Sequence, residues 1–118
     1  MNLVFISASR VPSSAANSIQ VMKVCQAYAQ LGQSVHLLVP GGRTTPWEKL
    51  ADHYGLVQPF AIEWIPAAPA LRRYDLAWKA LRRARQLGVE TVYTRMLQAA
   101  YLAQRQGIPV LLELTFVI

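Results

Sequence analysis

The chain has 118 residues, 53% of them hydrophobic and 15% charged, which is enough apolar side chain for one core and too little length for two domains. Twelve Lys and Arg against six Asp and Glu give a net charge of +6, which permits attraction to anions such as nucleotides, phosphates or lipid headgroups. The single cysteine, Cys25, excludes an internal disulfide and a cysteine-rich zinc site, so we expect a reducing compartment, the cytoplasm. We expect no secretory signal and no membrane span, because the first residues lack a basic start and no apolar run reaches about 18 residues.

Apolar, partly β-branched runs alternate with longer segments of helical spacing along the chain. The expected strands are residues 3–7, 35–39, 60–65, 91–93 and 110–114, and the expected helices begin at 17 or 18, 46, 72 and 96 and end at 31, 53 or 54, 87 and 106. This alternation predicts βαβ units around a parallel sheet. We therefore expect one α/β, Rossmann-like domain over residues 1–118, with about five strands in the order 3-2-1-4-5 and helices on both faces.

Local signals mark the ends of the first two helices. Asn17 or Ser18 is expected to cap the first helix, and Gly32 to end it. The segment Thr45-Pro-Trp-Glu48 has the form of a capping box with proline at the first helical position, and it predicts the start of the second helix. The buried stripe expected on the first helix consists of Val21, Val24, Cys25, Tyr28 and Leu31.

Several chemistries are excluded by missing motifs. The loop after the first strand, residues 8–17, contains no glycine, so neither a dinucleotide site nor a P-loop is expected there. The Gly-x-Ser-x-Gly turn of serine hydrolases is missing as well. No Asp-x-Asp or His-x-x-x-His pair indicates a metal, and His36 and His53 fall on different elements. We expect no metal and no cofactor, and we interpret both histidines as structural or surface residues.

Polar residues follow the strands whose carboxyl ends would carry a ligand site. Ser9, Arg10, Asn17 and Ser18 precede or begin the first helix, whose positive end suits a phosphate or a sugar hydroxyl. The alternative is that these side chains only solvate a loop and cap the helix. Arg95 follows the fourth strand and is expected at the same edge, where it would neutralise an anionic group.

Glu113 and Thr115, at the end of the fifth strand, are expected at this edge too. A carboxylate in an apolar run is costly to bury unless it is paired, which makes Glu113 a candidate functional residue. The alternative is an ordinary strand residue that faces solvent.

The third expected helix is basic. Its polar side carries Arg72, Lys79, Arg82 and Arg83, and its apolar side carries Tyr74, Ala77, Leu81 and Ala84. The polar side suits either plain solvation or a peripheral contact with an anionic membrane, at its inner face. No nucleic-acid partner is expected, because no recognition motif accompanies the charge and the aromatic residues are scattered.

Three segments resemble one enzyme family. They are residues 16–39, which begin Ala16-Asn-Ser-Ile and include Leu31-Gly, then Val92-Tyr-Thr-Arg95, and then Gly107-Ile-Pro-Val-Leu-Leu-Glu-Leu114. Together they resemble the N-terminal half of retaining glycosyltransferases of family 4, which have the GT-B fold. The similarity covers nearly the whole chain.

This resemblance implies a Rossmann-like domain that holds a hydroxyl acceptor and faces a second domain that holds a nucleotide sugar, with no metal between them. The family often has Glu-x-His at the end of the fifth strand, where this chain has Glu113-Leu-Thr115, and threonine cannot titrate near neutral pH. Large apolar residues occupy positions 116–118, so we expect further chain after Ile118 and an N-terminal half that is inactive alone. The alternative is a noncatalytic Rossmann-like module whose apolar last strand is buried by a second copy, as a homodimer.

Overall fold

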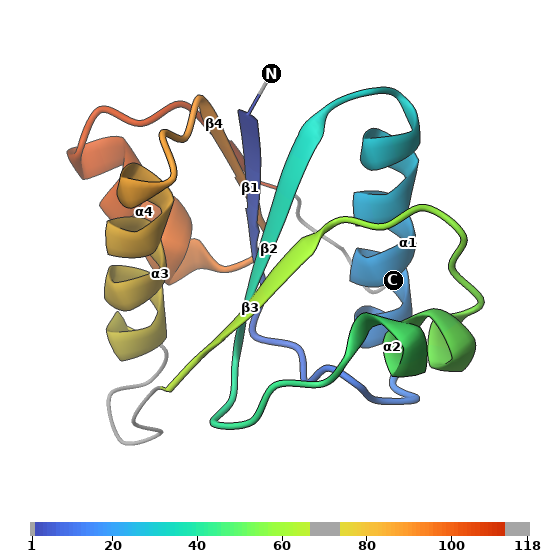
Figure 1. The fold of residues 1–118 in the computed structure, drawn as a ribbon. Helices are drawn as coiled ribbons and strands as arrows, with labels where there is room; N and C mark the ends of the chain where they lie inside the picture. The colour runs from blue at the N-terminus through green and yellow to red at the C-terminus, as the bar shows by residue number, and fades with distance from the viewer. Residues whose placement is uncertain (1, 67–73, 113–118) are drawn as a thin grey trace, which may run out of the picture.

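A computed structural model of the chain describes residues 2–66 and 74–112. One parallel sheet runs through the middle of the molecule in the order β3-β2-β1-β4-β5 (Figure 1). Its strands are β1 (Asn2–Ile6), β2 (Ser34–Pro40), β3 (Ala61–Ile65), β4 (Thr91–Thr94) and β5 (Val110–Leu112), and the helices are α1 (Ala16–Gln30), α2 (Trp47–Tyr54), α3 (Tyr74–Gln86) and α4 (Leu97–Arg105). The α/β class, the parallel sheet and the strand order confirm the sequence prediction.

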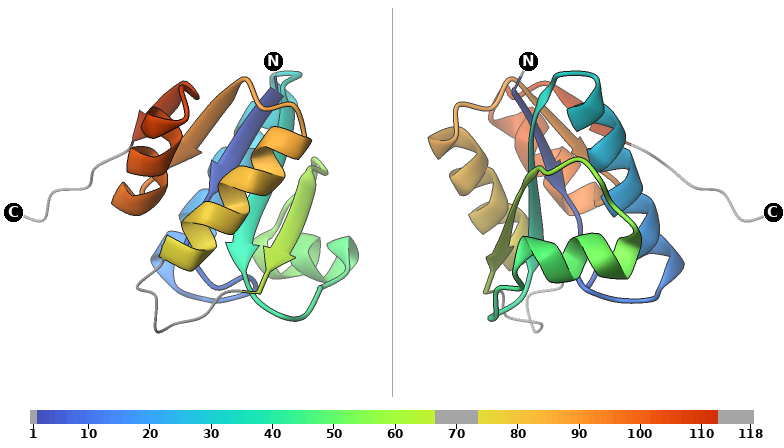
Figure 2. Two further views of the ribbon diagram at one scale, coloured as in Figure 1. Left: turned by 90° about the vertical axis from the view of Figure 1, so that its left-hand side faces the viewer. Right: turned by 45° about the vertical axis from the view of Figure 1, so that its right-hand side comes forward.

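Two helices cover each face of the sheet. Helices α1 and α2 lie on one face, and α3 and α4 lie on the other (Figures 1 and 2). The chain moves outward from β1 to β3 through α1 and α2, and then returns across the sheet to β4 and β5 through α3 and α4. Because βαβ crossovers are right-handed, this change of direction puts the two helix pairs on opposite faces.

The alternation of side chains along each strand divides the core into two layers. In β1, Leu3 and Phe5 pack under α1 and α2, whereas Val4 and Ile6 pack under α3 and α4. The same strands therefore serve both layers, which explains why the central strands read as nearly continuous apolar runs.

The buried side of α1 differs from the predicted stripe. Its fully buried residues are Ser18, Met22 and Cys25, whereas Leu31 is 74% exposed. Val21, Val24 and Tyr28 are only half-buried. The helix packs over β2 and against α2, and no described helix stands beside it above β4, so its β4 side stays partly open.

Neither of the first two helices starts as predicted. The N-cap of α1 is Ala15, so Asn17 and Ser18 lie inside the helix, and the N-cap of α2 is Pro46, which has an extended ψ of 147°. No side chain caps either helix by a hydrogen bond. Proline at the cap position leaves the Thr45 side chain too early in the chain to serve the first turn, so the predicted capping box is wrong.

Tyr74 also differs from its predicted place on the apolar side of α3, since it is 52% exposed. It is the first described residue of α3, two residues before the buried stripe that begins with Leu76 and Ala77. Arg72, Glu113, Thr115 and the last two predicted residues of the fifth strand lie outside the described residues. Within residues 2–66 and 74–112, no helix combines the length and apolar character that a membrane span needs.

Candidate ligand-binding site

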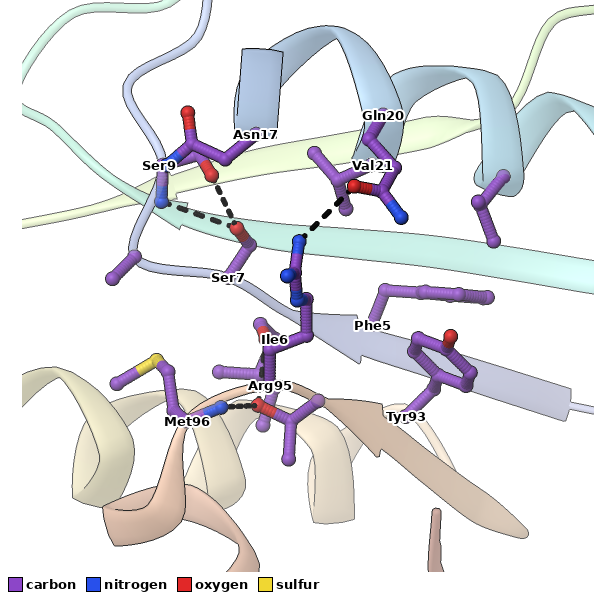
Figure 3. A pocket seen from close by; sticks show the side chains of 13 residues that line it. Phe5, Ile6, Ser7, Ser9, Asn17, Gln20, Val21, Tyr93, Arg95 and Met96 are labelled. Carbon is purple, nitrogen blue, oxygen red and sulfur yellow. Dashed lines mark hydrogen bonds between the residues drawn. The ribbon is translucent and has the colours of Figure 1, made fainter. Parts of the chain in front are cut away.

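A cavity of about 230 Å³ lies at the carboxyl ends of β1 and β4 (Figure 3). β1 continues through α1 toward β2, whereas its neighbour β4 continues through α4 toward β5, so the chain leaves the two strands in opposite directions. Open α/β sheets bind ligands at such a switch point. The described residues that line the cavity are Phe5, Ile6, Ser7, Ala8, Ser9, Asn17, Gln20, Val21, Val24, Tyr93, Thr94, Arg95 and Met96.

One wall of the cavity is apolar. The rings of Phe5 and Tyr93 lie side by side on neighbouring strands, with 4.8 Å between their centroids. Val21 and Val24, on the side of α1 that faces β4, continue this wall. Phe5 is fully buried and its ring is tilted by 36° to that of Tyr93, so the half-buried Tyr93 is the ring that a ligand in the cavity could contact.

The loop after β1 forms the polar wall and is fixed by its own hydroxyl groups. The Oγ atoms of Ser7 and Ser9 are 2.9 Å apart, and the backbone N–H of Ser9 donates to Ser7 Oγ at 3.1 Å. Ser7 also donates its backbone N–H to the carbonyl of Leu38 at 3.1 Å, as an extension of the β1–β2 pairing. The hydroxyl groups of Ser7 and Ser9 are therefore held in place at the carboxyl edge of the sheet.

Thr94 joins the two strands that meet at the site. Its buried hydroxyl donates to the carbonyl of Ile6 at 2.8 Å and accepts from the backbone N–H of Met96 at 3.0 Å. These two bonds turn the chain sharply at the end of β4, so that Arg95 reaches across to α1 and donates from Nη1 to Gln20 Oε1 at 3.2 Å (Figure 3).

The polar side chains of the described lining are hydrogen-bonding groups and one cation. Arg95 is its one charged residue, and the hydroxyls of Ser7 and Ser9 and the amides of Asn17 and Gln20 supply neutral hydrogen-bonding groups. This set suits a ligand with several hydroxyl groups or one anionic group. No carboxylate or imidazole occurs among these described lining residues.

The predicted site residues have different places in the structure. Ser9, Asn17 and Arg95 line the cavity. Arg10 is exposed and is not part of the described lining, and Ser18 is fully buried, with its Oγ atom 2.6 Å from the hydroxyl of Tyr54. Ser18 therefore joins α1 to α2 and does not face the cavity.

Ser7, Gln20 and Tyr93 also line the cavity and were missed as site residues by the sequence analysis. Ser7 is the last residue of the first predicted strand, and Tyr93 is the last residue of the fourth. Gln20 follows Asn17 by three residues, which puts the two on one side of the helix. Ser7 and Tyr93 could have been predicted as site residues, because the predicted strand order makes the first and fourth strands neighbours and these residues end them.

The structure also shows where the other potential metal ligands and the thiol of the described residues lie. Residues 2–66 and 74–112 contain no group of three His, Cys, Asp or Glu side chains that could hold a metal ion. The Cys25 thiol is buried in the core under α1, and burial raises its pKa far above the usual range. It is therefore a small core residue and not a nucleophile.

Together these features define an α/β protein of Rossmann-like topology with a cavity at its switch point. No known family model matches the sequence, and no curated protein matches it either. The fold is similar to the crystal structure of the C-terminal domain of a hydrogenase from Pyrococcus furiosus, with a TM-score of 0.57 over 96% of this chain and 90% of that one. The two sequences are 16% identical, so the likeness concerns the fold alone.

Proposed function

We propose that this chain is the acceptor-side domain of a glycosyltransferase of the GT-B type, which moves a sugar from a nucleotide sugar to a hydroxyl acceptor. The observation that carries the proposal is the cavity at the switch point, which combines an apolar wall that includes the Tyr93 ring, neutral hydrogen-bonding side chains and Arg95. Sugars are bound by this combination, in which an apolar surface packs against the ring and polar groups meet the hydroxyls. The sequence resemblance to family 4 transferases supports the same assignment.

The size and chemistry of the cavity suggest which substrate this domain would hold and which a second domain would hold. Ligand pockets are commonly about 300–1,000 Å³, so a cavity of about 230 Å³ suits one sugar or phosphate group better than a whole nucleotide sugar. The described lining holds no carboxylate and no imidazole. We therefore assign the nucleotide donor to a second domain and propose that the chain is inactive alone, in the cytoplasm, where its single cysteine stays reduced.

The test is to express the complete reading frame that encodes these residues and to measure transfer of labelled sugar from a panel of uridine and guanosine diphosphate sugars to simple hydroxyl acceptors, both phosphorylated and unphosphorylated. The 118-residue chain is run beside it. We expect transfer by the complete protein and none by the chain alone. A complete protein without a second α/β domain, or one that transfers no sugar from any donor, would contradict the proposal.

Arg95 provides the matched variant for this assay. We expect Arg95→Gln to raise the KM for a phosphorylated acceptor about tenfold or more, because it removes a charge-assisted hydrogen bond. Arg43→Gln is the control, since Arg43 is exposed and lies outside the described lining. An equal effect of both variants would show that general charge, and not the cavity, governs the acceptor.

A second candidate function rests on a different observation. Leu111 is 54% exposed on the α1 side of β5, and β5 has a described strand on one side only. An exposed apolar edge of this kind favours pairing with a second copy. The alternative function is therefore a noncatalytic, self-associating module, and it predicts a homodimer whose interface includes Leu111.

A further inference from the structure

The outer face of α3 carries an exposed stripe of aromatic and basic side chains. Tyr74, Trp78, Arg82 and Arg85 follow one another at intervals of four, four and three residues, which puts them on one side of the helix. Tyr74 and Trp78 are each 52% exposed. Single exposed apolar side chains are common on protein surfaces, whereas exposed rings gathered on one side of a helix mark a candidate contact surface.

The neighbouring helix repeats this arrangement. Leu97, Tyr101 and Arg105 lie four residues apart on α4, and all three are exposed. In each helix an arginine lies over the ring four residues before it: Arg82 Cζ is 5.8 Å from the ring centre of Trp78, and Arg105 Cζ is 6.0 Å from that of Tyr101.

The two stripes form one surface, which we call the α3–α4 face and which consists of Tyr74, Trp78, Arg82, Arg85, Leu97, Tyr101 and Arg105. The helices pack against each other, and a groove between them is lined by Trp78, Arg82, Arg85, Gln86 and Gln106. Both helices run from the carboxyl edge of the sheet to its amino edge, so the apolar ends of the two stripes lie at the same end of the face (Figure 2).

The charge of the α3–α4 face is all of one sign. Asp75 is the only acidic residue of the two helices, and it pairs with Lys79 at 3.1 Å. Arg83 is turned away and pairs with Glu63 on β3. Arg82, Arg85 and Arg105 form no ion pair with any described carboxylate, so their charges face solvent together.

We propose that the α3–α4 face docks on the surface of an anionic phospholipid bilayer. Trp and Tyr rings settle at the level of the headgroups, with the apolar part of the ring inward and the polar atom in water. Arginine stems lie along such a surface while their guanidinium groups reach the lipid phosphates. Positive charge of one sign over the α3–α4 face matches a surface of uniform negative charge, whereas a protein partner usually meets a mixed polar rim.

Vesicle sedimentation tests the proposal on the 118-residue chain. The probes are large vesicles of phosphatidylcholine alone and of phosphatidylcholine with 30 mol% phosphatidylglycerol, in 50 and 500 mM NaCl. We expect binding to the anionic vesicles only and loss of most of it at high salt. The variant Arg82→Glu/Arg105→Glu is expected to bind at least about 25-fold more weakly, from about fivefold for each arginine removed.

Lys23→Glu/Lys49→Glu is the matched control, because both lysines are exposed on α1 and α2, the helices of the opposite face. Both double variants lower the net charge from +6 to +2. The control is expected to keep most of its binding if the α3–α4 face is the docking surface. Circular dichroism melts confirm that all variants are folded.

Trp78 gives a second readout at the proposed contact. Anionic vesicles are expected to shift the tryptophan emission of the wild type to shorter wavelength, and Trp78→Phe is expected to remove this shift while keeping the binding. No binding to anionic vesicles at 50 mM NaCl, or equal loss in both double variants, would overturn the proposal. Binding to poly(U) RNA or polyglutamate without binding to vesicles would overturn it as well and assign the face to another class of partner.

Discussion

The hydroxyl groups near the start of α1 serve two different purposes. Ser7 and Ser9 hydrogen-bond with each other and line the cavity. Ser18 lies 2.6 Å from the hydroxyl of Tyr54, which also accepts the backbone N–H of Ser13 at 2.8 Å, and so ties α1 and the loop before it to α2. Residue type alone does not separate the two uses, because a serine needs the same chemistry for both and only its tertiary partner differs.

The Ser18–Tyr54 pair makes the first prediction at the residue scale. Ser18→Ala removes one partner of a buried hydrogen bond and is expected to lower the free energy of unfolding by about 1 to 2 kcal/mol, measured by urea denaturation. Ser14→Ala, at an exposed position of the loop before α1, is expected to change it by less than about 0.5 kcal/mol. Equal effects would mean that the Ser18 hydroxyl contributes nothing particular.

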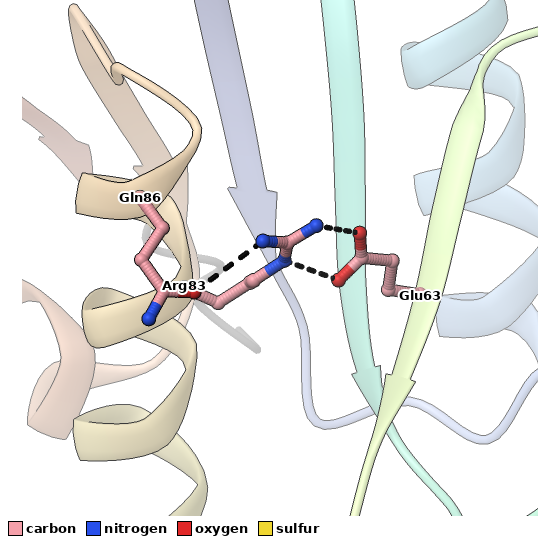
Figure 4. Close-up of polar contacts among 3 residues, drawn as sticks. All are labelled: Glu63, Arg83 and Gln86. Atoms are coloured by element: carbon pink, nitrogen blue, oxygen red, sulfur yellow. Dashed lines mark hydrogen bonds and ion pairs between the residues drawn. The ribbon is translucent and has the colours of Figure 1, made fainter.

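The second prediction concerns the ion pair between β3 and α3. Arg83 donates to both carboxylate oxygens of Glu63 at 2.8 Å (Figure 4). This hydrogen bonding, together with the positive charge of Arg83, lowers the pKa of Glu63 from its ordinary value of 4.5, against a smaller rise from burial. A carboxyl whose pKa is lowered on folding stabilises the fold above its unfolded pKa, and this stabilisation is lost as the pH falls through the folded pKa.

Glu63→Gln is therefore expected to lower the free energy of unfolding at pH 7 by at most about 1 kcal/mol, because both side chains are more than a third exposed. The difference from the wild type is expected to shrink below about pH 4.5 and to vanish at lower pH. Urea denaturation from pH 7 to pH 3 measures it. In a double-mutant cycle with Arg83→Gln, additive effects at pH 7 would contradict a direct pair.

At the scale of the elements, the pattern of apolar runs predicted all five strands, all four helices and the strand order. The helix starts were less predictable, because Ser18 has the side chain of a good cap but pairs with Tyr54, and Pro46 takes the cap position that Thr45 was expected to fill. The open side of α1 was also not predictable from periodicity. A helical pattern gives the direction of the apolar side, whereas the exposure of Leu31 depends on whether another element stands beside the helix.

The loop from β2 to α2 carries the third prediction. A Cβ atom at Gly41 would lie 2.8 Å from Cδ1 of Trp64, whose indole N–H donates to the carbonyl of Val11 at 2.8 Å and is held in place by that bond. Gly41→Ala is therefore expected to lower the free energy of unfolding by about 1 to 3 kcal/mol. Gly42→Ala is the control, since nothing lies within 4 Å of a Cβ there.

Thermal and urea denaturation compare the two glycine variants, and tryptophan fluorescence reports on the indole itself. We expect Gly41→Ala to alter the emission spectrum of the folded protein, because Trp64 must move or lose its bond to Val11. Gly42→Ala is expected to leave the spectrum unchanged. Similar stability of the two variants would show that the loop adapts without cost.

At the scale of the molecule, the course of the chain leaves one face unevenly covered. α1 and α2 accompany β1, β2 and β3, and no described helix covers β4 and β5 on that side. The uncovered part holds a shallow cavity of about 440 Å³ whose lining includes Tyr28, Leu31 and Leu111. This region adjoins the ligand cavity along α1, so whatever covers it also borders the candidate site.

The fourth prediction tests whether a second copy covers this region. Sedimentation velocity of the 118-residue chain between 5 and 500 µM is expected to show concentration-dependent association, because Leu31 and Leu111 are 74% and 54% exposed there. Leu111→Lys is expected to weaken the association about tenfold or more, since it would bury a charge against an apolar surface. Val57→Lys is the control, at an apolar position that is 81% exposed and lies outside this cavity.

The two candidate functions give different results in this experiment. A self-associating module requires a dimer of the wild type at micromolar concentration, and Leu111→Lys must then abolish its function together with its dimer. For a glycosyltransferase domain, association of the isolated chain is incidental, so the complete protein must transfer sugar at concentrations where it is a monomer. A monomeric chain at 500 µM, with Leu111→Lys unchanged, would remove the module as a candidate and leave the cavity at the switch point as the site that decides the function.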